Sequence, residues 1–238
     1  MAVDSEHKKN IQHDLWRLFQ LEKDLSNPNH PYHKFGTGNL STLRDIPASK
    51  GIAIREALLE FHDQYYSANI MKLVVMGKES IDELESWIRV LFEPVKNSNV
   101  QLEPFEGHPL SKSESGLITI VKPIKDWKHI QLTFGLPDTS KDYQIDVSKY
   151  FSHLIGHEGD GSITALLKRR GWATDLSAGT QHGGAGFDFF KISITLTENG
   201  LENYKQVVLS IFQYIHMLQT SPVYEWIFQE VIFINDNV

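Results

Sequence analysis

The sequence predicts a mixed α+β fold of two similar two-layer domains, each an antiparallel or mixed sheet with helices packed on it. Apolar residues recur at helical spacing in several segments, and short β-branched runs alternate with them. A polar, proline-containing stretch over 94–115 lacks either period and separates the two halves. The 41% hydrophobic and 22% charged residues are typical of globular proteins. Strands beside amphipathic helices on both sides of the linker favour the two-layer architecture.

In the first half, apolar residues at helical spacing predict three helices, a turn-rich loop follows the first, and a β-branched run closed by Gly77 predicts a buried strand. Ser80 and Glu83 form a capping box at the start of the third helix. In the order helix, loop, helix, strand and helix, the ranges are 4–24, 27–39, 55–66, 71–76 and 80–92.

The second half begins after the linker with two strand-like runs and two helices, and Gly171 ends the second helix. Two alternating segments and a long amphipathic helix follow. The strands are predicted at 117–121, 129–136, 176–180 and 187–197, and the helices at 147–155, 162–170 and 201–218.

The composition excludes several classes of function. A formal net charge of −7 argues against nucleic-acid binding, which needs a dense stripe of Lys and Arg. With no cysteine there is neither a disulfide framework nor a thiolate zinc site, which suits a cytoplasmic protein. No segment approaches the roughly 20 apolar residues that cross a bilayer. We therefore expect no nucleic-acid and no membrane partner.

Several segments together resemble a known family, and they run in order along essentially the whole chain. They are Ala2-Val3-Asp4-Ser5-Glu6-His7, Trp16-Arg17-Leu18-Phe19-Gln20-Leu21-Glu22-Lys23, Lys34-Phe35-Gly36-Thr37-Gly38-Asn39, Pro123-Ile124-Lys125-Asp126, His153-Leu154-Ile155-Gly156-His157-Glu158-Gly159, Lys168 with Gly171-Trp172, and Glu225-Trp226 with Phe228-Gln229-Glu230. These segments resemble the insulin-degrading-enzyme (pitrilysin) family of zinc metallopeptidases.

The resemblance implies four similar α+β domains that form two halves around a large chamber. Residues 1–108 resemble the C-terminal portion of the first, catalytic-type domain, which would be incomplete here. Residues 109–238 resemble a second, non-catalytic domain that carries an exosite and is truncated at its C-terminus. The chain would accordingly be a fragment of a zinc-dependent metalloendopeptidase.

The resemblance assigns Glu6 the role of third zinc ligand, and carboxylates are ordinary ligands of catalytic zinc. On spacing alone, Glu6 is a first-turn acid that offsets the helix dipole. The family takes two histidines and its general base from a His-x-x-Glu-His helix, and neither that motif nor His-Glu-x-x-His occurs among the 11 histidines. We therefore expect no catalytic residue in this chain, zinc in the full-length enzyme, and none bound by this chain alone.

Two aromatic residues, Trp16 and Phe19, resemble family residues that line the pocket near the scissile bond. The alternative for both is core packing, because aromatic residues at helical spacing are usually buried. His153 and His157 share a helical face and could bind metal. Without a neighbouring glutamate they have no base, so we favour a structural or binding role for the pair.

The resemblance places this histidine helix at an exosite, where the N-terminal end of a substrate adds a strand to a sheet edge and a carboxylate meets its amine. The family's usual Leu-Val-Gly is Leu-Ser-Ala here, and Ala178 brings a Cβ where glycine allows the closest approach. The alternative is an ordinary edge strand. The matching positions are His153, Gly156, Glu158, Leu176, Ser177 and Ala178.

Two functions follow from these observations. The first is a fragment, inactive by itself, of a peptidase that degrades peptides inside a closed chamber. The second is a short non-catalytic member that binds peptides or pairs with another subunit. The expected partners are peptide substrates and either the remaining domains of the same enzyme or a complementary half.

Overall fold

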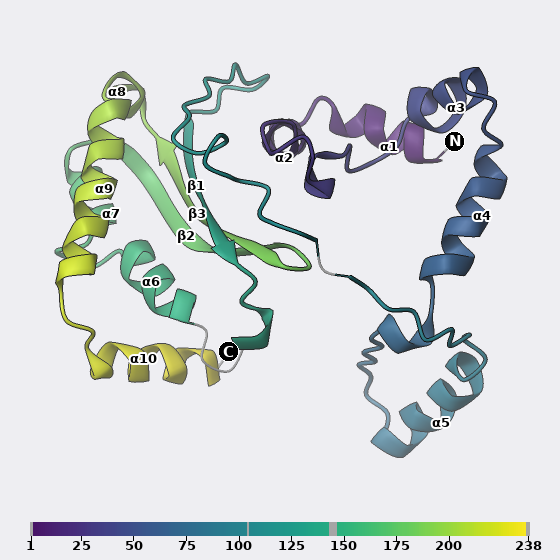
Figure 1. The fold of residues 1–238 in the computed structure, drawn as a ribbon. Helices are drawn as coiled ribbons and strands as arrows, with labels where there is room; N and C mark the ends of the chain where they lie inside the picture. The colour runs from purple at the N-terminus through teal and green to yellow at the C-terminus, as the bar shows by residue number, and fades with distance from the viewer. Residues whose placement is uncertain (1, 104, 143–146, 237–238) are drawn as a thin grey trace. The chain divides into compact units, whose positions relative to one another are not determined.

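The computed structural model describes residues 2–103, 105–142 and 147–236 of the chain, which divides into two compact units (Figure 1). The first unit contains Met1–Asn10 and Gly36–Pro104, and the second contains Ile11–Phe35 and Phe105–Val238. The mixed α+β class is confirmed, because helices accompany a three-stranded antiparallel sheet. The domain boundary after residue 108 stays a prediction.

Helices account for the regular structure that is described in the first unit. Asp4 fixes the first of them, since its carboxylate accepts a hydrogen bond from the Leu40 N–H at 3.0 Å and pairs with Lys8 at 2.8 Å. Ser80 caps the last by accepting from the Glu83 N–H at 3.3 Å, as predicted. The elements are α1 (Ala2–Asn10), η2 (Ser41–Asp45), α3 (Ile46–Ser49), α4 (Ile54–Tyr65), η3 (Ala68–Ile70) and α5 (Ile81–Phe92).

The sheet of the second unit consists of β1 (His129–Pro137), β2 (Ala173–Gly184) and β3 (Phe187–Leu196) in the order β1-β3-β2. Both pairings are antiparallel, and β2 and β3 form a hairpin. Figure 1 shows β3 between its two neighbours. The central strand therefore has hydrogen-bonding partners on both sides, and β2 has a strand on one side only.

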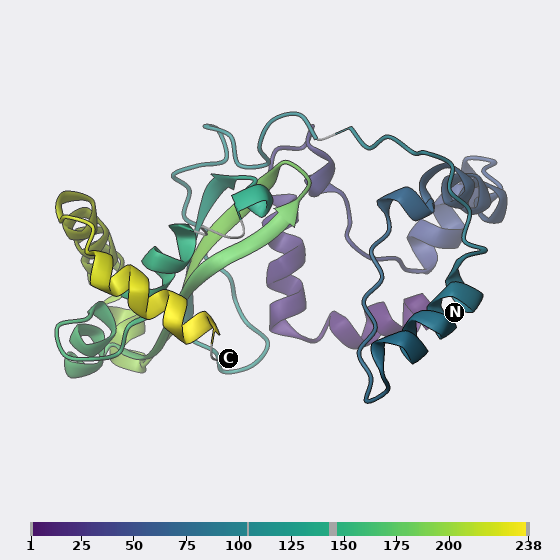
Figure 2. The ribbon, with the colours of Figure 1, turned by 90° about the horizontal axis from the view of Figure 1, so that it is seen from below.

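Helices precede and follow the strands of the second unit. Figure 2 shows α10 beside α6, where the Tyr150 hydroxyl of α6 accepts from the Tyr224 N–H at 3.2 Å. The helical elements are α2 (Asp14–Asp24), η1 (Pro31–His33), η4 (Ser140–Asp142), α6 (Val147–Gly156), α7 (Ile163–Arg169), α8 (Glu198–Glu202), α9 (Tyr204–Thr220) and α10 (Glu225–Asp236).

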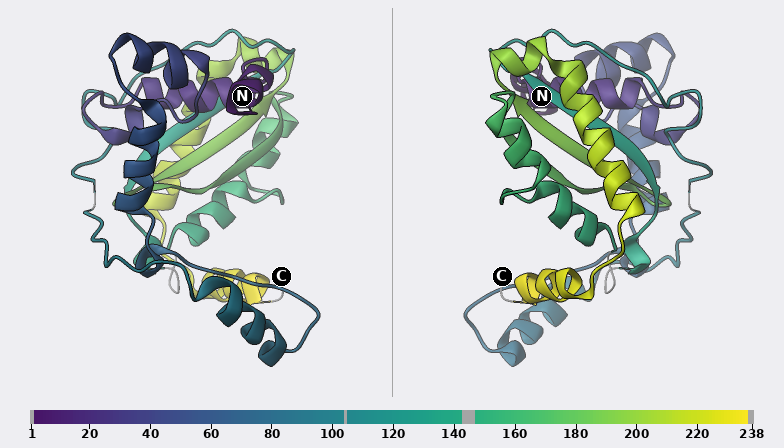
Figure 3. Two further views of the ribbon diagram at one scale, coloured as in Figure 1. Left: turned by 90° about the vertical axis from the view of Figure 1, so that its right-hand side faces the viewer. Right: turned by 90° about the vertical axis from the view of Figure 1, so that its left-hand side faces the viewer.

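One face of the sheet packs on helices α6, α7 and α9 (Figure 3). Side chains alternate between the two faces of a strand, so Ile192 and Ile194 of β3 point to the same side. They form one buried cluster with residues of the other strands and of the three helices. The cluster contains Ile155, Ile163, Leu167, Ala173, Leu176, Ile192, Ile194, Leu196, Val207 and Ile211.

The opposite face of β3 is covered by the segment 11–35. Phe187 and Phe189 are buried there, and their ring centroids lie 5.0 Å from His30 and 5.3 Å from Tyr32. Lys191, two residues along the same face, forms a 2.6 Å ion pair with Glu22 of α2. Both faces of the central strand are therefore covered, and its first three residues, Phe187 to Phe189, are buried in succession.

Three predicted elements are wrong. The helix over 4–24 is two helices with a turn at residues 11–12, because α1 belongs to the first unit whereas α2 is anchored in the second. The runs 71–76 and 117–121 are not strands, and Met76 and Ile118 are 97% and 81% exposed. A strand forms by pairing with a neighbour, and none pairs with either run in the described part of the chain.

Truncation of Ile192 to Ala should lower the free energy of unfolding by roughly 2–5 kcal/mol, because the side chain is fully buried between the sheet and its helices. Urea denaturation followed by circular dichroism measures the change. Ile118→Ala in the same unit is the matched control and should change stability by less than about 0.5 kcal/mol. Equal losses in the two variants would contradict the assignment of the core.

Candidate functional site

The candidate site lies at the open edge of β2. Thr195 of β3 directs its carbonyl towards β2, since it accepts from the Thr174 hydroxyl at 3.4 Å. Leu196 directs its N–H the other way, to the Lys128 carbonyl at 2.9 Å. Backbone groups of an antiparallel strand alternate in this manner, so Thr195 and Ser193 pair with Asp175 and Ser177 of β2.

The intervening residues of β2 therefore direct their backbone groups away from the sheet. These are Leu176 and Ala178, opposite Ile194 and Ile192. No strand of the described residues pairs with β2 on that side. An edge with unpaired N–H and C=O groups is a template for an added strand. Leu176 keeps its side chain in the core, Ala178 is half-buried and Ser177 is exposed.

Helix α6 runs next to this strand and carries the histidine of the predicted exosite. A Cβ built at Gly179 would lie 3.9 Å from the Ser152 Oγ of α6, which is van der Waals contact. His153 follows on α6, and its Nε2 lies 3.7 Å from the Glu230 carboxylate of α10. Gly156 is the last residue of α6, and a Cβ there would meet nothing within 4 Å. The helix end has open space beside it.

Glu158 follows α6 and has a side chain that is 63% exposed. Its carboxylate lies 3.3 Å from the Lys168 ammonium of α7. An exposed pair of this kind contributes little to stability and exchanges partners readily. Glu158 can therefore accept a different ammonium group, such as the amino terminus of a peptide.

His157 takes part in the loop that follows α6. Its Nδ1 accepts a hydrogen bond from the Gly159 N–H at 2.9 Å, and its ring centroid is 5.9 Å from that of His153. Neither histidine belongs to a group of three or more potential metal ligands among the described residues. The structural or binding role of this histidine pair stays a prediction.

The predicted zinc ligand Glu6 lies exposed on α1 in the first unit. Within the described ranges, it is in no group of three or more His, Asp or Glu side chains that could hold a metal. The residues present therefore do not fit the family's catalytic zinc. Its role as a ligand in a longer chain stays a prediction.

The aromatic residues Trp16 and Phe19 belong to α2 in the second unit. Their ring centroids are 6.2 Å apart in an edge-to-face arrangement, and Trp16 is 50% exposed. Lys23 lies 5.4 Å from the Phe19 ring. Both rings are accessible at the surface of this unit, and their role in a substrate pocket stays a prediction.

One further group of polar side chains was not predicted from the sequence. Asp138, His182 and Asp188 lie together at the end of the sheet, although they are up to 50 residues apart in sequence. The signal that could have revealed them is Asp188, a charged residue between the apolar Phe187 and Phe189.

Comparison with known proteins identifies the family. Residues 53–235 match the family model described as "Peptidase M16 inactive domain". The chain belongs to the M16 peptidase family. It is 46% identical over 231 residues to the A-factor-processing enzyme of Saccharomyces cerevisiae, covering 97% of this chain and 22% of that protein. It is also 46% identical over 229 residues to human insulin-degrading enzyme, covering 96% of this chain and 22% of that protein.

The fold also matches a solved structure. The crystal structure of pitrilysin superimposes with a TM-score of 0.88 at 29% sequence identity, covering 96% of this chain and 24% of that one. The chain spans about a quarter of the length of the curated relatives it matches. The resemblance inferred from sequence is thus confirmed.

Amide hydrogen exchange should alternate along β2. The N–H groups of Ser177 and Gly179 bond to β3 and should exchange slowly, whereas those of Leu176 and Ala178 point to the open edge and should exchange faster. Residue-resolved exchange by NMR measures the four rates in one sample. Equal protection of all four would show that something within the chain already pairs with this edge.

Proposed function

We propose that this chain is the peptide-anchoring part of an M16 zinc metalloendopeptidase. The observation that supports it most is the open edge of β2, flanked by α6 and the Glu158 that follows it. A strand added here gains main-chain hydrogen bonds whatever its side chains are. Such a site suits an enzyme family whose substrates are peptides of varied sequence.

In this proposal the peptide lies extended along β2 and pairs with the backbone groups of Leu176 and Ala178. Its free amino terminus replaces Lys168 as the partner of Glu158. The open space at Gly156 leaves room for the first residue of the peptide. His153 stays oriented by Glu230 at the side of α6. Peptide backbone and terminal amine are thus recognised by different groups.

The chain by itself is proposed to lack peptidase activity. Zinc enzymes of this kind need several protein ligands and a base that activates water. Glu6 is predicted to be one such ligand, and the sequence contains no His-x-x-Glu-His helix to supply the rest. We therefore derive no hydrolytic step from the residues present.

Further properties of the full-length relatives remain proposals for this chain. We propose that it acts with the remaining domains of one enzyme to degrade peptides inside a closed chamber, in the cytoplasm. The alternative is a non-catalytic member that binds peptides or pairs with a complementary half. Among the described residues, no helix has the length and apolar character of a membrane span.

Replacing Glu158 with Gln should weaken binding of a peptide with a free amino terminus by roughly threefold to tenfold, because the variant keeps the shape but loses the charge. Isothermal titration calorimetry measures the affinity. Glu202→Gln, an exposed change on α8, is the matched control and should bind as the unaltered chain does. An N-acetylated peptide should be insensitive to Glu158→Gln. Equal binding of the acetylated and free peptides would refute the amine contact.

Hydrolysis of an internally quenched peptide by the purified chain should not rise above the buffer rate, with or without added zinc. Mass spectrometry of the peptide checks for cleavage at any bond. The decisive control is Glu6→Ala. Cleavage that a chelator abolishes and that Glu6→Ala removes would contradict the proposal that this chain is inactive alone.

A further inference from the structure

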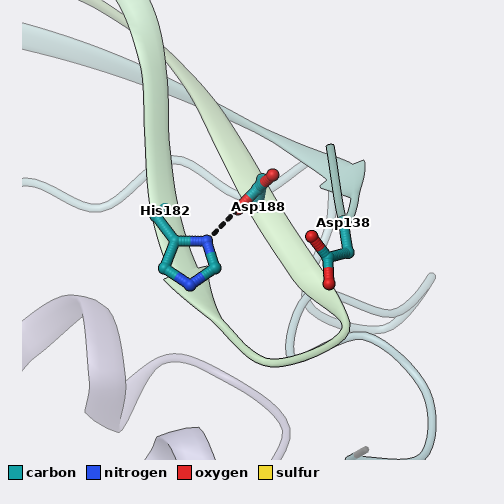
Figure 4. A group of neighbouring side chains, drawn as sticks. All are labelled: Asp138, His182 and Asp188. Carbon is teal, nitrogen blue, oxygen red and sulfur yellow. Dashed lines mark hydrogen bonds and ion pairs between the residues drawn. The ribbon is translucent and has the colours of Figure 1, made fainter. Parts of the chain in front are cut away.

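A compact group of potential metal ligands lies at one end of the three-stranded sheet. Asp138 immediately follows β1, His182 is near the end of β2, and Asp188 is the second residue of β3. His182 and Asp188 are register partners in the β2–β3 hairpin. Each residue offers one ligand atom, and these atoms lie within 4.8 Å of one another (Figure 4).

Backbone and hydroxyl donors hold both carboxylates in place. Asp188 is only 2% exposed, and its Oδ2 accepts from the Thr139 N–H at 2.8 Å and the Thr139 hydroxyl at 2.7 Å. Asp138 accepts from the Ser140 N–H at 2.9 Å and the Gly186 N–H at 3.2 Å. Hydrogen bonds of this kind orient metal-binding carboxylates. The two side chains need little reorganisation to bind an ion.

The group carries negative charge that the protein compensates incompletely. Burial alone would raise the pKa of Asp188, but hydrogen bonds from Thr139 and His182 hold it below its usual value. Hydrogen bonds from Ser140 likewise lower the pKa of Asp138. Both carboxylates are therefore ionised at neutral pH. Among the residues that the structure describes, no lysine or arginine forms a salt bridge with either carboxylate. The one basic side chain that pairs with them is His182, which contacts Asp188.

We propose that Asp138, His182 and Asp188 form a binding site for a divalent transition-metal ion, with Zn²⁺ as its preferred occupant. One imidazole nitrogen and two carboxylate oxygens are a ligand set that zinc accepts, and solvent water completes the coordination. The prediction that this chain binds no zinc by itself rested on Glu6, which lacks a His-x-x-Glu-His helix, and on the paired histidines of α6.

The geometry needs a small contraction to bind the ion. Ligand bonds of about 2.0–2.2 Å allow two ligands of one zinc ion to be at most roughly 4.4 Å apart. The observed spread of 4.8 Å exceeds this by a few tenths of an ångström. His182 is 63% exposed and faces Asp188 across 2.7 Å from Nδ1 to Oδ1, so its ring is free to make the adjustment. The ion would take the place of the hydrogen that Nδ1 donates to Asp188, and the imidazole would then carry its hydrogen on Nε2.

A bound ion would join the ends of all three strands. It would link the residue after β1 to both strands of the hairpin, so it would stabilise the folded sheet against unfolding. Without metal, the His182–Asp188 side-chain hydrogen bond adds to the backbone pairing of the hairpin strands here. The stability of the folded chain should therefore depend on metal if the site exists. This dependence can be measured without any peptide ligand.

Titration of the chelator-treated chain with ZnCl₂ by calorimetry should show a site that His182→Ala weakens by roughly tenfold or more, since even loss of a supporting group costs 10- to 100-fold. Zinc should also raise the thermal unfolding midpoint of the unaltered chain and of His216→Ala, an exposed histidine on α9, but not that of His182→Ala. Asp138→Asn, which keeps the size of the side chain, should lose the zinc effect while keeping the circular dichroism spectrum of the fold.

Two outcomes would refute the zinc site. If His182→Ala and Asp138→Asn bind zinc as the unaltered chain does, the zinc is held elsewhere and the proposal fails. If zinc raises no unfolding midpoint in the unaltered chain, the proposal fails as well. Because neither readout involves a peptide or hydrolysis, both outcomes are independent of the function proposed for the edge of β2.

Discussion

The burial of β3 on both faces and along both edges is the constraint on which the second unit depends. Its even-numbered side chains, such as Ile192 and Ile194, pack on α6, α7 and α9, and its odd-numbered ones, such as Phe189, pack on residues 11–35. Its backbone groups pair with β1 and β2. Because β3 is paired on both edges and covered on both faces, the open edge belongs to an outer strand, β2. Helix α6 packs beside that strand.

Carboxylates fix the segments around this core. Asp14, at the start of α2, accepts from the backbone N–H groups of Ile124 and Lys125 at 2.9 and 3.0 Å, and these hydrogen bonds lower its pKa. Glu22, near the end of the same helix, pairs with Lys191 of β3. Segments that are distant in sequence are thus joined by carboxylates. The carboxylate of Asp14 also satisfies two backbone N–H groups that would otherwise be unpaired. The same device orients Asp138 and Asp188 at the far end of the sheet.

Much of the second unit could be predicted from local patterns. Alternation of polar and apolar residues over 187–197 predicted β3, and Ser162 and Gly171 predicted the two ends of α7. What depends on pairing could not be predicted in this way. The run 71–76 has the composition of a strand but no strand partner in the described residues, and its last residue, Met76, is exposed. The meeting of Asp138 with His182 depends on sheet register, which no single segment encodes.

Membership of the M16 family and the open edge of β2 together lead to one central claim, that this chain anchors peptides by strand addition. The most direct measurement is residue-resolved amide exchange with and without a peptide that has a free amino terminus. The claim predicts that the peptide slows exchange at Leu176 and Ala178 and leaves Ser177 and Gly179, already bonded to β3, unchanged. Peptide binding with no slowing at Leu176 and Ala178 would contradict it.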